Sequence, residues 1–192
     1  MSKVKTIIII VLSVLLFLTI SQTCYIRFSN KLEVRSYEYT TLQITSVEIT
    51  LTKSTAKQLI KDLYNTPHIY IEGTFKDGRT GNSMPLLRYV KMDKNATIHD
   101  YIIGYAHELT HIKYQVGNET YVSYMTFVNL YESGNAELKY HAMIYANEVV
   151  SGDYAGTDYD CGYYILEYLG GINEIKSIWK FKKRIRIKRC IN

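Results

Sequence analysis

Apolar and polar residues alternate in the first half of the chain and follow a helical period in the second half. Residues 31–52 nearly alternate, as in Leu42–Ile49, and this period of two predicts a pair of strands. Two more strands are predicted at Ile69–Phe75 and Leu86–Met92. The turn Lys76–Arg79 between them contains an Asp-Gly pair, which is typical of a β-hairpin. The pattern therefore predicts a small, mostly antiparallel sheet in the N-terminal half.

Farther along the chain, apolar residues recur at steps of three and four, the period of an amphipathic helix. The clearest such helix follows Thr97, whose residue type favours the N-cap position, and Gly117 supplies a stop signal. Its apolar positions are Ile98, Tyr101, Ile102, Tyr105 and Leu109. Other helices are predicted at 54–64, with Ser54 as the cap, and at 123–133, 136–150 and 158–169. We therefore expect an α+β fold in which the sheet comes first and a helical half follows.

The clearest of these predicted helices contains the sequence H-E-L-T-H at residues 107–111. On a helix, positions i and i+4 lie on one face, so the imidazoles of His107 and His111 can reach one metal ion. A glutamate beside the first histidine can act as general base on a water that the metal holds. The spacing therefore predicts His107 and His111 as metal ligands and Glu108 as the catalytic residue.

This motif and its flanks resemble the zincin superfamily of zinc metallopeptidases, whose pattern is H-E-x-x-H. Gly104, Ala106 and Ile112 fit the uncharged flanks of the superfamily pattern, whereas Lys113 stands where an apolar residue is expected. The resemblance implies a zincin-like domain, a bound Zn²⁺ ion and hydrolysis of peptide bonds in a peptide or protein substrate.

The resemblance also implies a third protein ligand, for which several residues compete. The metzincin extension is absent, because Tyr114 and Gly117 stand where its glycine and histidine would be. The gluzincin type instead uses a glutamate on a second helix. Glu132 is the preferred candidate, since its interval from the motif is close to that of the thermolysin-like group. Glu119, close to the expected end of the motif helix, ranks second, and Glu137 ranks third.

A zincin also supplies a hydrogen-bond donor to the oxyanion of the transition state, and the sequence leaves this choice open. The resemblance implies a histidine or a tyrosine in that role. The chain contains 19 tyrosines, so composition selects none of them. The candidates are His141, Tyr154, Tyr159 and Tyr163. His99, two turns before the first motif histidine, is a candidate for a supporting role.

Zincins bind an extended substrate along an edge strand that precedes the motif helix. Leu86–Val90 is the candidate for that edge strand in this chain. The alternative is an ordinary hairpin with no role in binding.

The N-terminus carries a separate signal. Two lysines precede an apolar run at residues 6–20. This arrangement predicts a single-pass signal anchor with the catalytic domain on the exported side of a membrane, or a secreted protein if the segment is cleaved. Export would permit a disulfide between Cys161 and Cys190, although Cys24 makes the number of cysteines odd and leaves the pairing open.

Positive charge gathers at the C-terminus, where residues 176–192 contain eight of the 23 lysines and arginines and supply most of the net charge of +5. A solvated tail is expected there, with contact to anionic lipid as the second choice. Specific nucleic-acid binding is not expected, because aromatic residues are not interleaved in a base-reading pattern. The predicted organisation is a signal segment at 1–28, a zincin-like domain at 31–180 and a basic tail at 181–192.

These observations together predict a small zinc metallopeptidase, membrane-anchored or secreted. The alternative is a non-enzymatic surface or envelope protein at a membrane, in which the histidine pair is incidental or forms a structural metal site.

Overall fold

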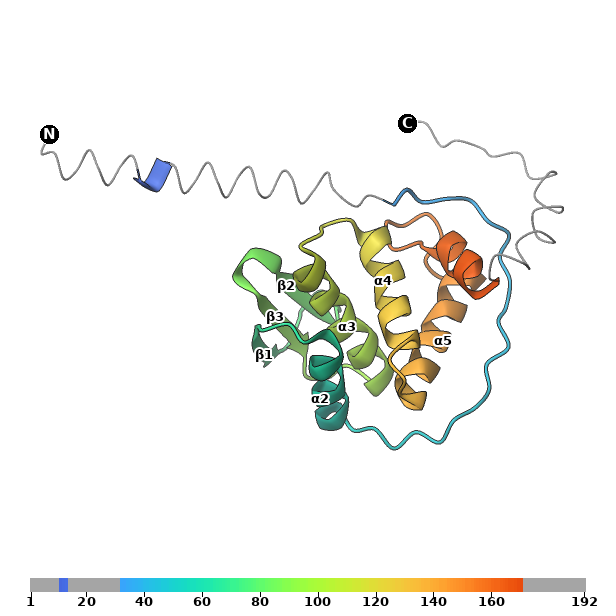
Figure 1. Cartoon of the computed structure of the whole chain (residues 1–192), viewed down its shortest axis with the longest axis horizontal. Helices are drawn as coiled ribbons and strands as arrows, with labels where there is room; N and C mark the ends of the chain where they lie inside the picture. Colours follow the sequence, from blue (N-terminus) through green and yellow to red (C-terminus); the bar gives the residue numbers. More distant parts are fainter. Residues whose placement is uncertain (1–10, 14–31, 171–192) are drawn as a thin grey trace, which may run out of the picture.

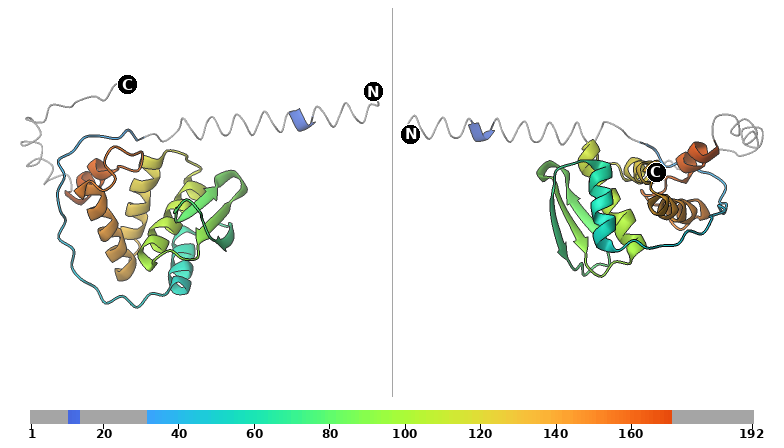
Figure 2. Two further views of the ribbon diagram at one scale, coloured as in Figure 1. Left: turned by 180° about the vertical axis from the view of Figure 1, so that it is seen from behind. Right: turned by 60° about the horizontal axis from the view of Figure 1, so that its bottom comes forward.

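The computed structural model describes residues 11–13 and 32–170, and within them the fold is α+β, as predicted (Figure 1). A three-stranded sheet lies on one side of helix α3 (Ile98–Tyr114), and two helices lie on its other side. Figure 2 shows the same layers from two further directions. The remaining elements are α2 (Lys53–Tyr64), β1 (Ile69–Gly73), β2 (Gly81–Met84), the 3₁₀ turn η1 (Pro85–Leu87), β3 (Tyr89–Asp93), α4 (Glu119–Tyr131), α5 (Ala136–Ser151) and a helix at 162–170.

The sheet has the order β1-β3-β2 and is mixed rather than mostly antiparallel. Strands β1 and β3 run parallel, with Ile69 opposite Tyr89, so the predicted hairpin between them was wrong. The Asp-Gly turn is present, and Gly78 has a φ of +75°, but the turn leads into β2, which pairs antiparallel with β3. The sequence of β2, Gly-Asn-Ser-Met, contains no β-branched or aromatic residue, so the pattern of apolar residues gave no signal for it.

Residues 32–52 form no strand, and the prediction of two strands there was wrong. This segment passes in an extended course around the outside of α5 (Figure 1). Hydrogen bonds to that helix, rather than pairing with a neighbouring strand, hold the segment in place. Thr40 N donates to the Val150 carbonyl at 3.0 Å, and Leu42 N donates to Asn147 Oδ1 at 2.8 Å.

Helix α3 begins at its predicted cap but ends at Tyr114, before the predicted stop signal Gly117. The Thr97 side chain accepts a hydrogen bond from Asp100 N, and Gln115 closes the helix in the left-handed conformation with a φ of 52°. The apolar face of α3 is buried against α2, the sheet and the α4–α5 pair, so that α3 lies at the centre of the core. A Cβ at Gly104 would lie 2.8 Å from Thr80 Cγ2, so this glycine permits the close approach of helix and sheet.

Helix α4 begins four residues before its predicted start. Asn118 caps it by accepting a hydrogen bond from Tyr121 N at 2.8 Å, so Glu119 becomes its first residue. Helix α5 agrees with prediction, and Asn135 caps it in the same way through Glu137 N and Leu138 N. The first residues of α4 and α5 determine which of Glu119, Glu132 and Glu137 faces the motif helix.

Within residues 11–13 and 32–170, no helix combines the length and the hydropathy that a bilayer span requires. On this finding, the predicted single-pass signal anchor, with a domain on the exported side, is not supported. Apart from residues 11–13, the predicted signal segment lies outside the described residues. Cys24, Cys190 and the basic tail at 181–192 lie outside them as well.

Candidate metal centre

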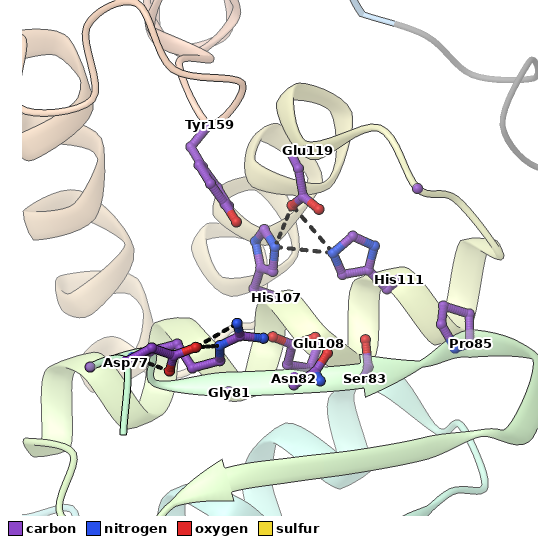
Figure 3. A pocket seen from close by; sticks show the side chains of 13 residues that line it. Asp77, Gly81, Asn82, Ser83, Pro85, His107, Glu108, His111, Glu119 and Tyr159 are labelled. Carbon is purple, nitrogen blue, oxygen red and sulfur yellow. Dashed lines mark hydrogen bonds and ion pairs between the residues drawn. The ribbon is translucent and has the colours of Figure 1, made fainter. Parts of the chain in front are cut away.

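The two motif histidines and one glutamate bring their ligand atoms together at the end of α3. His107 Nε2 and His111 Nε2 lie 3.1 Å apart. Glu119 Oε2 lies 3.0 Å from His107 Nε2 and 3.4 Å from His111 Nε2 (Figure 3). Among the described residues, this is the group of three that can hold one metal ion.

The loop between α3 and α4 places Glu119 opposite the histidines. Gln115 turns the chain at the end of α3, and Asn118 starts α4 only three residues later. Glu119 in the first turn of α4 therefore faces the last turn of α3. Glu119 ranked second in the sequence because the chain must reverse sharply to bring it back to the histidines. The left-handed backbone of Gln115 makes this reversal.

Glu132, the preferred third ligand in the sequence, does not lie with the histidines. It is the C-cap residue of α4, and the thirteen residues of the helix separate it from the N-cap by about 20 Å. Its Oε1 accepts a hydrogen bond of 2.6 Å from the Tyr168 hydroxyl. Glu137, the third choice, accepts hydrogen bonds from Thr50 N and Leu51 N, each at 2.9 Å. The structure therefore brings Glu119, and neither of the other two, to the motif.

Hydrogen bonding sets the tautomer of His111. Its Nδ1 lies 2.7 Å from the Val116 carbonyl, which can only accept, so Nδ1 carries the proton. When His111 is neutral, the lone pair is therefore on Nε2, on the side of Glu119 and His107, as a metal ligand requires. His111 is buried, and this backbone contact fixes its ring orientation.

The charge balance of the metal-free group favours an anionic glutamate. Burial alone would raise the pKa of Glu119, but hydrogen bonds from His107 and His111 outweigh it and lower the pKa to about 2. Burial would lower the pKa of His111, but the hydrogen bond and the charge of Glu119 outweigh it, so the pKa is raised.

The distances fit a tetrahedral zinc ion. Zinc–nitrogen and zinc–oxygen bonds are about 2.0–2.2 Å long, so two ligand atoms on a tetrahedron lie about 3.3 Å apart. The three separations of 3.0, 3.1 and 3.4 Å are close to that value. Two imidazole nitrogens and one carboxylate oxygen are also donors that zinc accepts.

A cleft of about 680 Å³ gives access to this group. Figure 3 shows Glu108 in the cleft between the histidines and β2, beside Asn82 and Ser83. Glu108 is buried at 9 % exposure and packs against Gly81. A Cβ at Gly81 would lie 3.0 Å from Glu108 Cγ and 2.9 Å from Met92 Sδ, so the glycine makes room for the carboxylate.

The four candidates for oxyanion stabilisation lie in different places relative to the metal-binding group. Tyr159 lines the cleft, with its ring centroid 5.7 Å from that of His107. His141 is buried, and its Nδ1 lies 3.0 Å from Nδ1 of His99. Tyr154 lines a second cavity beside the cleft, and the Tyr163 ring lies under the Arg35 guanidinium. Figure 3 shows the Tyr159 hydroxyl on the side of His107.

The strand that borders the cleft is β2, not the predicted Leu86–Val90. Residues 85–87 form the 3₁₀ turn η1, and β3 begins at Tyr89 in the middle of the sheet. Strand β2 is an edge strand, and its residues Gly81, Asn82 and Ser83 line the cleft.

No family model, no curated protein and no solved structure matches this chain. The convergent donor atoms and the open cleft therefore carry the functional argument.

Proposed function

We propose that this chain is a zinc-dependent peptidase of the zincin type, similar to the gluzincins, with His107, His111 and Glu119 as the metal ligands. The observation that carries the proposal is the convergence of these three donors beside Glu108 at an open cleft. The proposal keeps the predicted chemistry and replaces the third ligand.

Three protein ligands favour a catalytic over a structural metal site. A structural zinc site is closed by four protein ligands, whereas a catalytic site keeps one position for water or substrate. Among the described residues the group contains three, and it lies at the cleft wall. When bound, zinc would polarise a peptide carbonyl and lower the pKa of water.

Glu108 is proposed as the general base and acid. Its carboxylate would accept a proton from the attacking water and pass it to the nitrogen of the leaving amine. Its side chain is largely buried beside Gly81, which limits its exposure to water.

Tyr159 is proposed as the donor to the oxyanion. Burial raises the pKa of its hydroxyl, and the charges of Glu119 and Glu108 raise it further, so the hydroxyl stays protonated at neutral pH. A neutral hydroxyl can donate to the negative oxygen that forms when water attacks the peptide carbonyl.

Strand β2 is proposed to bind the substrate backbone. It pairs with β3 along one edge, and its residues line the cleft along the motif helix. An extended peptide can add to such an edge through main-chain hydrogen bonds, which places its carbonyl groups along the cleft.

The test is the exchange Glu108→Gln, which removes the base and preserves the size of the side chain. Loss of at least a hundredfold in cleavage of a quenched peptide mixture is expected, with the bound zinc retained. Glu132→Gln, at the far end of α4, is the matched control and should cleave like the parent. Equal cleavage by Glu108→Gln and the parent would show that Glu108 is not the base.

A further inference from the structure

A second cavity opens beside the cleft and extends along α3 toward the N-terminus of that helix. Its volume is about 210 Å³, and His107, Glu108 and Tyr159 line both spaces. Small-molecule sites usually have volumes of roughly 300–1,000 Å³, so this cavity suits a single side chain. A substrate bound at the metal centre would therefore have one side chain at its entrance.

Carboxylates from two helices line this cavity. Asp100 comes from the first turn of α3, and Glu148 comes from the last turns of α5. Tyr154 also lines it, and its pKa is raised to about 12 by burial and then by the charges of Glu148 and Asp100. Both negative charges therefore act on the same small space.

The positive charge at the cavity wall is already compensated. Arg79 lines the cavity, but its guanidinium lies 2.6 Å from the Asp77 carboxylate. Both side chains of this pair are about half exposed, so water screens them as well. Among the residues that line the cavity, the three carboxylates of Asp100, Glu108 and Glu148 therefore outnumber this one paired cation.

Two histidines lie behind Glu148 at the edge of the cavity. His99 Nε2 lies 3.4 Å from Glu148 Oε1, and His99 Nδ1 lies 3.0 Å from His141 Nδ1. Burial and the neighbouring His99 lower the pKa of His141 to about 4, so His141 is neutral at neutral pH. The contact of His99 with Glu148 involves one of the two carboxylate oxygens, Oε1.

We propose that this cavity is a subsite for a cationic side chain, so that the enzyme prefers lysine or arginine next to the bond that it cleaves. Glu148 and Asp100 would pair with the cation, and the ring of Tyr154 would contact it. The substrate preference rests on the proposed peptidase function, whereas binding of a cation in the cavity does not.

The first test measures binding without turnover. The zinc-treated full-length chain carrying Glu108→Gln is titrated with two blocked pentapeptides that differ only in a central lysine or norleucine. The lysine peptide is expected to bind about tenfold more tightly, and the ratio should fall to about one when Glu148→Gln is added. Glu132→Gln, added in place of Glu148→Gln, should leave the ratio unchanged. Equal binding of the two peptides, no binding of either, or a ratio that Glu148→Gln leaves intact would overturn the subsite.

The second test separates the subsite from the proposed function. The parent chain is given a peptide mixture, and the residues beside each cleaved bond are read by mass spectrometry. Glu108-dependent cleavage without a basic preference would overturn the subsite and support the peptidase. Lysine-selective binding without any cleavage would support the subsite and contradict the peptidase.

Discussion

At the residue scale, residues outside the motif hold the proposed metal ligands and the proposed base in place. His111 is oriented by the Val116 carbonyl, and Glu119 by its place in the first turn of α4. Gly81 has a similar effect on Glu108, because it lets β2 approach that carboxylate. The chemistry of the motif is therefore supported by residues outside the motif.

Gly81→Ala tests this support. The new Cβ would press on Glu108 Cγ and Met92 Sδ, and we expect at least tenfold slower peptide cleavage with zinc still bound, because a displaced base reacts poorly. Cleavage and zinc content are measured on the same preparation. Gly117→Ala is the control, since a Cβ there meets no atom within 4 Å, and it should have the smaller effect. Equal effects of the two exchanges would contradict the role of Gly81.

The sequence alone could reveal His107, Glu108 and His111, because their spacing on a helix is a local property. It did not select Glu119 over Glu132, because that choice depends on where α4 begins. Asn118 was the available signal, since asparagine directly before a helix is a favoured cap. The choice of Tyr159 among 19 tyrosines required the tertiary structure, because the loop that carries it has no sequence pattern of its own.

At the scale of elements, the start of α4 links helix stability to the metal centre. Asn118 Oδ1 accepts hydrogen bonds from Tyr121 N at 2.8 Å and from Leu32 N at 3.1 Å. The same residue therefore caps α4, contacts the segment 32–52 and immediately precedes Glu119, the proposed third ligand.

Asn118→Ala should lower the free energy of unfolding by about 1 kcal/mol and also weaken zinc binding, because the first turn of α4 carries Glu119. Asn135→Ala is the matched control. It removes the cap of α5 and should cost a similar stability without affecting zinc affinity. Denaturant unfolding and competition with a zinc chelator measure the two quantities. Equal zinc affinity in both variants would contradict the link.

The helices were predicted more reliably than the sheet. Helices α3 and α5 carry caps and a period of three to four that are visible over many residues. Strand β2 is short and polar, and the extended segment 32–52 alternates like a strand but bonds to α5. Strand pairing depends on distant partners, which the local pattern does not contain.

At the scale of the whole molecule, α3 joins the sheet to the α4–α5 pair, and His141 lies in this packed interior. Burial and His99 lower the pKa of His141 to about 4, while the charge of Glu137 acts in the opposite direction. Neutral His141 is therefore part of the folded state.

Stability should consequently fall in mild acid. The pKa of His141 is about 6.5 when unfolded and about 4 when folded, so the unfolded chain takes up the proton first as the pH falls. Above pH 6.5, His141 is neutral in both states and does not reduce the free energy of unfolding. Between pH 6.5 and pH 4, its protonation in the unfolded chain lowers that free energy by up to about 3 kcal/mol. Denaturant unfolding of the metal-free chain across this range, compared with His141→Asn, measures it. The substitution should make the free energy of unfolding depend less on pH. An equally steep pH dependence in the variant would show that His141 is not its cause.

The central claim is that His107, His111 and Glu119 hold one zinc ion, and the most direct measurement is the metal content of the purified full-length chain. About one zinc per chain is expected in the parent and in Glu132→Ala, and almost none in His107→Ala and Glu119→Ala. Circular dichroism checks that each variant is folded. A folded parent without zinc, or zinc that is lost from Glu132→Ala and kept by Glu119→Ala, would contradict the claim.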